Sequence, residues 1–204
     1  MQDFIISGVG KINGGEFDTV RVGGIGTCTS SIKAKNLHIE GVFNCTGDVE
    51  ADYIYCEGVA DFKSNIRAKK ISVTGVITEK FGTKIEAEEI ICAGVIKTSG
   101  EISADRISAE GCIEASEIVG DYIKIDSHYH GKRIIKLFNK YKSDVKLIEA
   151  TTIDISSVSA ETVNGKDIKI GPYCSINNID CSGILSIDRS AVVKNITGNY
   201  TMRD

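Results

Sequence analysis

The segment IYCEGVADFKSNIRAKKI (residues 54–71) decides the fold of this chain. Within it, apolar or small residues fall on every second position from Ile54 to Ala68, and the series restarts three residues later at Ile71. Alternation with a period of two is typical of extended backbone with one buried face, and the step of three indicates a corner at which the chain begins another turn. Seven steps of two and one step of three lead from Ile54 to Ile71, and this interval is one repeat.

The same pattern precedes and follows this segment, so the chain is built from repeats. Glycines that end a strand recur at intervals of 17, 17, 17, 19 and 17, and the longer interval predicts a widened turn near Lys80 to Thr83. Coils of this kind bury their inward side chains only against the coils before and after them. We therefore predict an all-β fold, a single-stranded β-helix with coils of about 17 residues. The glycines are Gly24, Gly41, Gly58, Gly75, Gly94 and Gly111, and two predicted inward columns are Ile32, Val49, Ile66, Ile85, Ile102, Ile118 and Leu37, Ile54, Ile71, Ile90, Ile107, Ile123.

Three regions follow one another along the 204 residues. Residues 1–127 carry the N-terminal coils, and residues 147–204 return to the coil pattern in a tighter form, with apolar residues that step by five. Between them, residues 128–146 hold six Lys or Arg against one Asp, and their apolar residues are spaced for one face of a short helix. We predict a basic amphipathic helical insertion at 128–146 in one continuous solenoid.

Further segments carry a family resemblance. They are ISGVGKINGG (6–15), the recurring alternation of apolar residues ending in glycine and followed by I-x-A over residues 20–111, and VNGKDIKIGPYCSI (163–176). Together they resemble the bactofilins, polymer-forming bacterial cytoskeletal proteins, and the last segment is similar to a stretch in longer members from spore-forming Gram-positive bacteria. The resemblance implies a right-handed β-helix with a triangular core, which polymerises end to end without nucleotide and organises cell-envelope or cell-shape processes. It also implies partners among cell-envelope enzymes or membrane proteins.

Physical reasoning about the ends of a solenoid also favours self-assembly. A β-helix has two open edges, each with unpaired backbone N–H and C=O groups and an uncovered slice of core, and natural proteins normally shield such edges. No shielding segment is evident at either end of the coil pattern, so we predict that the end coils form the polymer interface. The predicted interface residues are Phe4, Ile6, Ile12 and Val20 at the N-terminal end and Leu185, Ile187, Val193 and Ile196 at the C-terminal end.

The basic insertion has three candidate roles. Its apolar stripe can pack along the solenoid with the cations in solvent, its cations can hold an anionic membrane surface while the apolar residues insert, or it can bind a protein partner. The sequence favours the first role and leaves the other two open. The candidate contact residues are Lys132, Arg133, Ile134, Lys136, Leu137, Phe138 and Lys140.

The composition indicates a cytoplasmic protein, with the inner face of the membrane as the place to which the insertion could attach it. No apolar run approaches the length of a membrane span, and the start MQDFIISG lacks a basic and then apolar signal region. The seven cysteines are expected to be free, with Cys28, Cys45, Cys56 and Cys92 at inward positions. A net charge of −4 opposes binding to nucleic acid.

No catalytic, metal or cofactor site is predicted. The main alternative is a left-handed β-helix acyltransferase, whose chemistry needs a His as general base, and the steps between apolar residues do not distinguish the two hands. The chain has three His, of which His38 is expected to face solvent and His128 and His130 fall in the insertion. The sequence contains no C-x-x-C pair, and the two His of the insertion lack a third ligand nearby. We therefore predict a self-assembling scaffold, not an enzyme.

Overall fold

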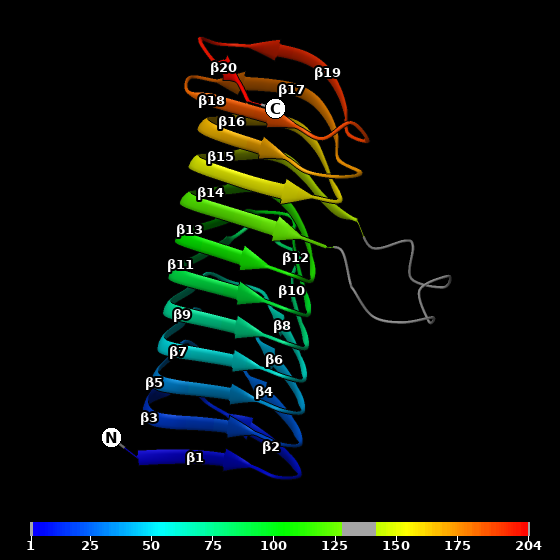
Figure 1. The fold of residues 1–204 in the computed structure, drawn as a ribbon. Coiled ribbons are helices and arrows are strands. Elements are labelled where there is room, and N and C mark those ends of the chain that lie inside the picture. The colour runs from blue at the N-terminus through cyan, green and yellow to red at the C-terminus, as the bar shows by residue number, and fades with distance from the viewer. Residues whose placement is uncertain (1, 128–141, 204) are drawn as a thin grey trace, which may run out of the picture.

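The computed structural model describes residues 2–127 and 142–203, which form one solenoid of parallel β-strands with about 11 turns (Figure 1). No helix occurs in these two ranges. The predicted all-β solenoid is therefore confirmed. Most of the predicted helical insertion, up to residue 141, lies outside the described residues.

The strands alternate between long and short ones in the N-terminal coils. These are β1 (Gln2–Ile6), β2 (Val9–Ile12), β3 (Gly15–Val22), β4 (Ile25–Cys28), β5 (Ile32–Ile39), β6 (Val42–Cys45), β7 (Val49–Cys56), β8 (Val59–Phe62), β9 (Ile66–Val73), β10 (Val76–Glu79), β11 (Lys84–Cys92), β12 (Val95–Thr98) and β13 (Glu101–Ala109). The remaining strands are β14 (Cys112–Asp126), β15 (Ser143–Ser156), β16 (Val158–Ile170), β17 (Ser175–Cys181), β18 (Ile184–Ile187), β19 (Val192–Thr197) and β20 (Thr201–Met202).

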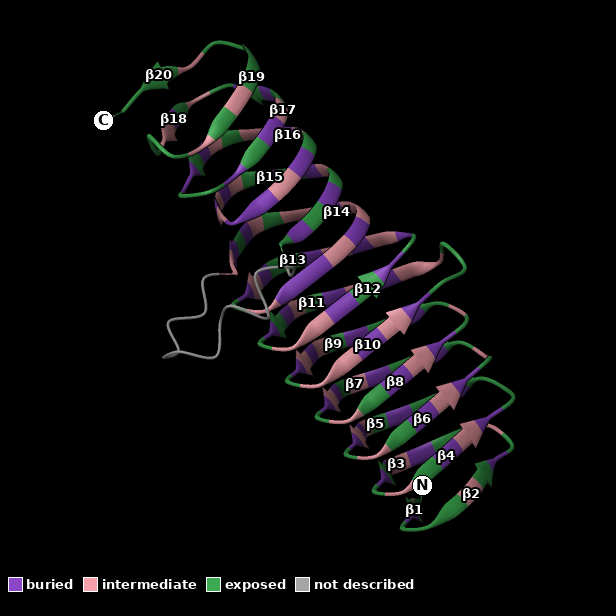
Figure 2. Ribbon diagram, turned by 90° about the vertical axis from the view of Figure 1, so that its right-hand side faces the viewer, coloured by how far each residue is buried: buried purple, intermediate pink, exposed green. Residues whose placement is uncertain are grey.

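The coil is right-handed. In Figure 1 the chain rises from the N-terminus at the bottom to the C-terminus at the top, and the long strands nearest the viewer, such as β5 and β7, run from left to right. Figure 2 turns the right-hand side of the molecule to the viewer, so the face that is nearest the viewer in Figure 1 lies on the left in Figure 2. There the short strands β6 and β8 run from left to right, away from the viewer of Figure 1. A chain that climbs while it turns in this sense is a right-handed helix. Of the two hands that the sequence left open, the left hand is therefore excluded.

Each coil has three sides because the long strand bends once and the short strand supplies the third side. In β7, Val49 and Ala51 point inward, and the step of three to Ile54 changes the parity and turns the chain. Strand β8 then places Ala60 and Phe62 inward. The repeat predicted from alternation and one parity break is thus the repeat that the structure adopts.

The two predicted inward columns are confirmed. Each of their members faces the next in parallel register, and all twelve residues are at most 2% exposed. On the third side, large residues lie over small ones: Phe43 is in register with Gly26 below and Ala60 above. The core therefore keeps a constant cross-section by alternating side-chain sizes.

The recurring glycines mark corners at which the coils touch. A Cβ on Gly41 would lie 2.0 Å from the carbonyl oxygen of Gly24, and one on Gly58 would lie 2.0 Å from that of Gly41. No larger residue fits there without moving the backbone. The widened turn is also confirmed, because residues 80–83 separate β10 from β11, Gly82 has φ +74, and the register offset rises from 17 between Val59 and Val76 to 19 between Val76 and Val95.

The C-terminal coils are tighter, as predicted. Strand β15 is in register with β16 so that Ile148 faces Val163, and Ile148, Ile153 and Val158 are all buried. The boundary predicted between the insertion and these coils needs a correction. The coil resumes at Ser143 and not at residue 147, because Ser143 and Val145 already point inward at the start of β15. The charged residues Asp144 and Lys146 face outward and hide this strand in the sequence.

Candidate assembly surfaces at the ends of the solenoid

The first and last coils each leave one strand edge open. Strands β1 and β2 form ladders with β3 and β4, and strands β19 and β20 form ladders with β17 and β18. Within the described ranges, no strand covers the other side of these four. The backbone N–H and C=O groups of such an edge can pair with another chain. The two ends are therefore candidate assembly surfaces.

The core at the N-terminal end is more closed than the sequence predicts. Ile6 lies over Gly10, where an added Cβ would be only 3.1 Å from the Ile6 side chain. Phe4 meets Phe17 edge to face, with ring centroids 5.7 Å apart. Ile6 and Ile12 are consequently buried, and only Phe4 of the predicted N-terminal set remains partly accessible. The end of the tube is filled by its own aromatic and aliphatic side chains.

Two predicted interface residues belong to inner layers. Val20 is in register with Phe4 of β1, and Leu185 is in register with Met202 of β20. Both are 0% exposed, so neither side chain is accessible at an end of the solenoid. The sequence shows that these residues point inward, but it does not show that a further strand covers each of them.

The C-terminal end exposes more apolar surface. Ile187 and Val193 are partly buried against the core, and Ile196 is 36% exposed. Sequence reasoning missed two further apolar residues at this end, Val192 (60% exposed) and Met202 (55% exposed). Met202 lies in a strand of two residues, which is too short to show a periodic pattern. Its position becomes evident only from its register with Leu185.

Phe4 and Met202 terminate the same inward column. Register pairs connect Phe4 to Val20, continue through every coil to Ile168 and Leu185, and end at Met202. Each end of the molecule thus presents an accessible apolar side chain on the same side of the tube. Stacking two such ends would continue the column across the joint.

The candidate membrane or partner residues of the insertion lie outside the described residues. They are Lys132, Arg133, Ile134, Lys136, Leu137, Phe138 and Lys140. The structure does show where the chain leaves and re-enters the coil. The hydroxyl oxygens of Ser127 and Ser143 are 3.1 Å apart, and the Ser143 oxygen also accepts a hydrogen bond from the backbone N–H of Ile113 at 3.0 Å. The insertion therefore begins and ends at one point of a coil.

The interior holds polar groups that are bonded within the protein. Burial raises the pKa of the Cys45 and Cys92 thiols to about 12 and that of Cys56 to about 11, so these thiols stay protonated at neutral pH. All seven cysteines are free, as predicted, and the buried set includes Cys112, Cys174 and Cys181 besides the four predicted to point inward. The Glu79 carboxylate accepts hydrogen bonds from the Thr98 hydroxyl at 2.8 Å and from the backbone N–H of Phe81. This contact stabilises the widened turn.

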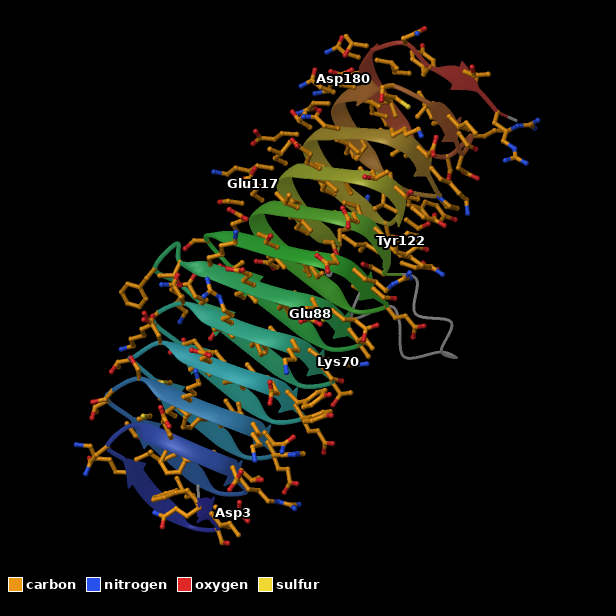
Figure 3. The ribbon with its side chains drawn as sticks, turned by 90° about the vertical axis from the view of Figure 1, so that its left-hand side faces the viewer. Asp3, Lys70, Glu88, Glu117, Tyr122 and Asp180 are labelled. Carbon is orange, nitrogen blue, oxygen red and sulfur yellow. The ribbon has the colours of Figure 1, made fainter. Side chains whose placement is uncertain are left out.

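Many of the charged residues on the lateral faces pair along the solenoid axis. Figure 3 shows Lys70, Glu88, Glu117 and Tyr122 on the outside of the solenoid. Lys70 pairs with Glu89 of the next coil at 2.7 Å, and Lys33 pairs in the same way with Glu50 at 2.7 Å. His38 also faces outward, where its ring is stacked on Tyr55. Among the described residues, no group of three His, Cys, Asp or Glu side chains is placed to hold a metal ion.

No protein-family model matches the chain, and no curated protein and no solved structure matches it significantly. In residues 2–127 and 142–203, no helix is long and apolar enough to cross a membrane.

Proposed function

We propose that the protein is a self-assembling scaffold of the bactofilin type, which forms polymers by end-to-end stacking of its β-helix without nucleotide. The observation that carries this proposal is the pair of open ends. Each end has strands with a single hydrogen-bonded neighbour, and the C-terminal end exposes Val192, Ile196 and Met202. Stacking satisfies the backbone groups of both edges and removes this apolar surface from water.

The lateral faces support the same choice. Their charges already pair between neighbouring coils within one chain, so a side-by-side contact would gain less than an end-to-end contact. The partners in this proposal are further copies of the chain, together with cell-envelope enzymes or membrane proteins that the polymer recruits at the cytoplasmic side of the membrane. The role needs no catalytic residue and no cofactor.

The test is a substitution at the exposed end of the shared column. Met202→Lys places a charge where a free end lets the side chain reach water but a stacked joint does not. We expect the wild type to form polymers in chelator without added nucleotide, and Met202→Lys to remain short or monomeric while it keeps its β-sheet circular dichroism. Sedimentation velocity and negative-stain electron microscopy measure both properties.

The matched control is Tyr53→Lys, which adds the same charge on a lateral face at a residue of similar exposure, 41%. This variant should polymerise as the wild type does. A wild type that stays monomeric at high concentration would contradict the scaffold proposal. Polymers that persist in Met202→Lys but disappear in Tyr53→Lys would move assembly to the lateral faces.

A further inference from the structure

A row of aliphatic residues runs along the outside of the N-terminal coils. Each one is the first residue of a short strand, and each is in parallel register with the next. Exposure is 86% for Val9, 49% for Ile25 and 40% for Val42. Figure 2 shows this exposure at the start of strands β2, β4, β6 and β8. We call these residues the aliphatic stripe: Val9, Ile25, Val42, Val59, Val76 and Val95.

The corner beside the stripe makes it accessible. Each stripe residue directly follows a corner glycine, such as Gly41 before Val42 or Gly58 before Val59. These glycines have no side chains that could cover the aliphatic groups. Adjacent strands are about 4.8 Å apart, so six residues in register form a continuous apolar surface about 24 Å long. Aligned exposed aliphatic surface of this kind is typical of an interaction site.

The rim of the stripe is acidic. Cys112 continues the stripe by one coil, and the rim consists of the residues two positions before and two positions after each stripe residue and Cys112. Five of these rim residues are acidic and two are basic. Lys97, one of the two basic residues, pairs with Glu114. Glu57, Asp61 and Glu110 add negative charge along the rim. An occupant of this surface should therefore combine aliphatic side chains with positive charge.

One segment of this chain has that composition. Residues 128–141 contain Ile134, Ile135, Leu137 and Phe138 together with three Lys, one Arg and no acidic residue. An anionic membrane surface would also suit such a segment, but the acidic rim of the stripe would be repelled by it. The segment and the stripe thus fit each other better than the stripe fits a membrane.

Both ends of this segment are attached at the end of the stripe. Cys112 is in register with Val95, the last member of the stripe. The Ser127 hydroxyl donates to the carbonyl oxygen of Gly111 at 3.0 Å, and the Cys112 thiol donates to that of Lys142 at 3.5 Å. Ser127 and Lys142 thus lie over Gly111 and Cys112, so the chain departs and returns two coils beyond Val95, on the same corner of the solenoid.

The length of the segment is sufficient. Residues 128–141 are 14 residues, so half of them extend at most about 23 Å from the point of attachment. Val59 lies four coils from the coil of Ser127 and Lys142, which is about 19 Å at the spacing of parallel strands. The middle of the segment, which contains its aliphatic residues, can reach the stripe as far as Val59.

We propose that the aliphatic stripe is the docking surface for the chain's own segment 128–141, with the aliphatic residues of the segment on the stripe and its Lys and Arg toward the acidic rim. Docking removes exposed apolar surface from both parts and pairs charges of opposite sign. It is independent of assembly through the ends, since the stripe lies on the side of the solenoid.

Site-directed crosslinking tests the proposal. The seven native thiols are buried, so a short bis-maleimide should react with introduced surface cysteines first. In the double variant Val76→Cys/Leu137→Cys we expect a crosslink within one chain, seen as a shifted monomer on a denaturing gel. The control Ser103→Cys/Leu137→Cys uses an outward residue of the long strand β13, and we expect no crosslink there. Equal crosslinking in both variants, or dimers alone, would overturn the proposal.

Limited proteolysis gives a second measurement that does not depend on crosslinking. Trypsin can cut the segment after Lys132, Arg133, Lys136 and Lys140. In Val59→Asp, a charge on the stripe should release the segment and raise the rate of cleavage within it about tenfold. The control is Ser72→Asp, an outward substitution away from the stripe, which should leave the rate unchanged. Unchanged cleavage in Val59→Asp, together with flotation of the wild type on anionic vesicles, would assign the segment to the membrane instead.

Discussion

The N-terminal and C-terminal halves of the solenoid build the same three-sided core from coils of different length. In the N-terminal half one coil leads from Ile54 to Ile71, whereas in the C-terminal half the coil from Ile148 to Val163 is two positions shorter. The inward positions of the C-terminal coils alternate steps of two and three, as in Ile148, Ala150 and Ile153. Two of the three corners in an N-terminal coil contain one residue more than the equivalent corners of a C-terminal coil.

The extra residues explain the outer surface of the N-terminal half. The corner between Ile39 and Phe43 holds Glu40, Gly41 and Val42, whereas the equivalent corner between Ile155 and Val158 holds only two residues. The longer corner brings a glycine against the carbonyl oxygen of the coil below and points a valine outward. The glycine corners and the aliphatic stripe are thus one feature, and both are confined to the longer coils. The cross-section of the core does not depend on this feature.

The largest expected effect is the loss of the core in either half. Ile71→Asp and Ile153→Asp each place a carboxylate at an inward position that is at most 1% exposed. We expect each to cost at least about 3 kcal/mol, from the lost burial of isoleucine and the buried charge, and to abolish folding at moderate temperature. Far-ultraviolet circular dichroism in a urea titration measures it.

Outward neighbours are the controls for this pair. Ser72→Asp in the longer coils and Thr151→Asp in the shorter ones should unfold at nearly the wild-type urea concentration. If the inward and the outward aspartate variant of one half unfold at the same urea concentration, the two halves do not share a continuous core.

A smaller effect is expected at the corners of the longer coils. Gly58→Ala would place its Cβ 2.0 Å from the carbonyl oxygen of Gly41, so the two coils must separate locally. We expect a loss of about 1–3 kcal/mol in the free energy of unfolding, as for other overpacked sites. Chemical denaturation followed by circular dichroism gives the value. Gly8→Ala is the matched control, because Gly8 occupies the equivalent corner of the first coil and nothing lies within 4 Å of an added Cβ there. Equal losses of stability in the two variants would show that glycine is required for backbone flexibility and not for the close contact.

The smallest effect at neutral pH is expected from the thiols. Burial raises the pKa of Cys45 and Cys92 to about 12, whereas a thiol in an unfolded chain has a pKa of about 8.5. The unfolded chain therefore loses these protons first as the pH rises, so the stability contributed by the protonated thiols is complete below about pH 8.5 and decreases between that pH and about 12.

Thiol titration and alkaline denaturation measure this behaviour. At pH 8 the folded protein should react slowly with a thiol reagent, and the seven thiols should become available on unfolding in urea. Cys45→Ala should make the stability less dependent on pH above 8.5. Rapid reaction of several thiols in the folded protein would contradict the buried placement of these residues.

Much of the core could be predicted from local patterns, whereas the ends could not. The parity of Ile54, Cys56 and Ile71 follows from alternation, since each inward residue is separated from the next by one outward residue. Val20 and Leu185 show the limit of this reasoning. Both were assigned to the interface because they point inward near an end, but Phe4 and Met202 cover them. Ser143 shows another limit, because a polar inward residue and charged outward neighbours conceal the start of β15.

The sequence by itself determined the period, the inward positions and the glycine corners, because alternation and the absence of a side chain are properties of consecutive residues. The tertiary structure decided which apolar residues are accessible, because that depends on how many strands lie above and below each one. It also decided that Val9, Ile25 and Val42 form a surface. In the sequence they are single apolar residues about 17 positions apart, and only parallel register places them on neighbouring strands.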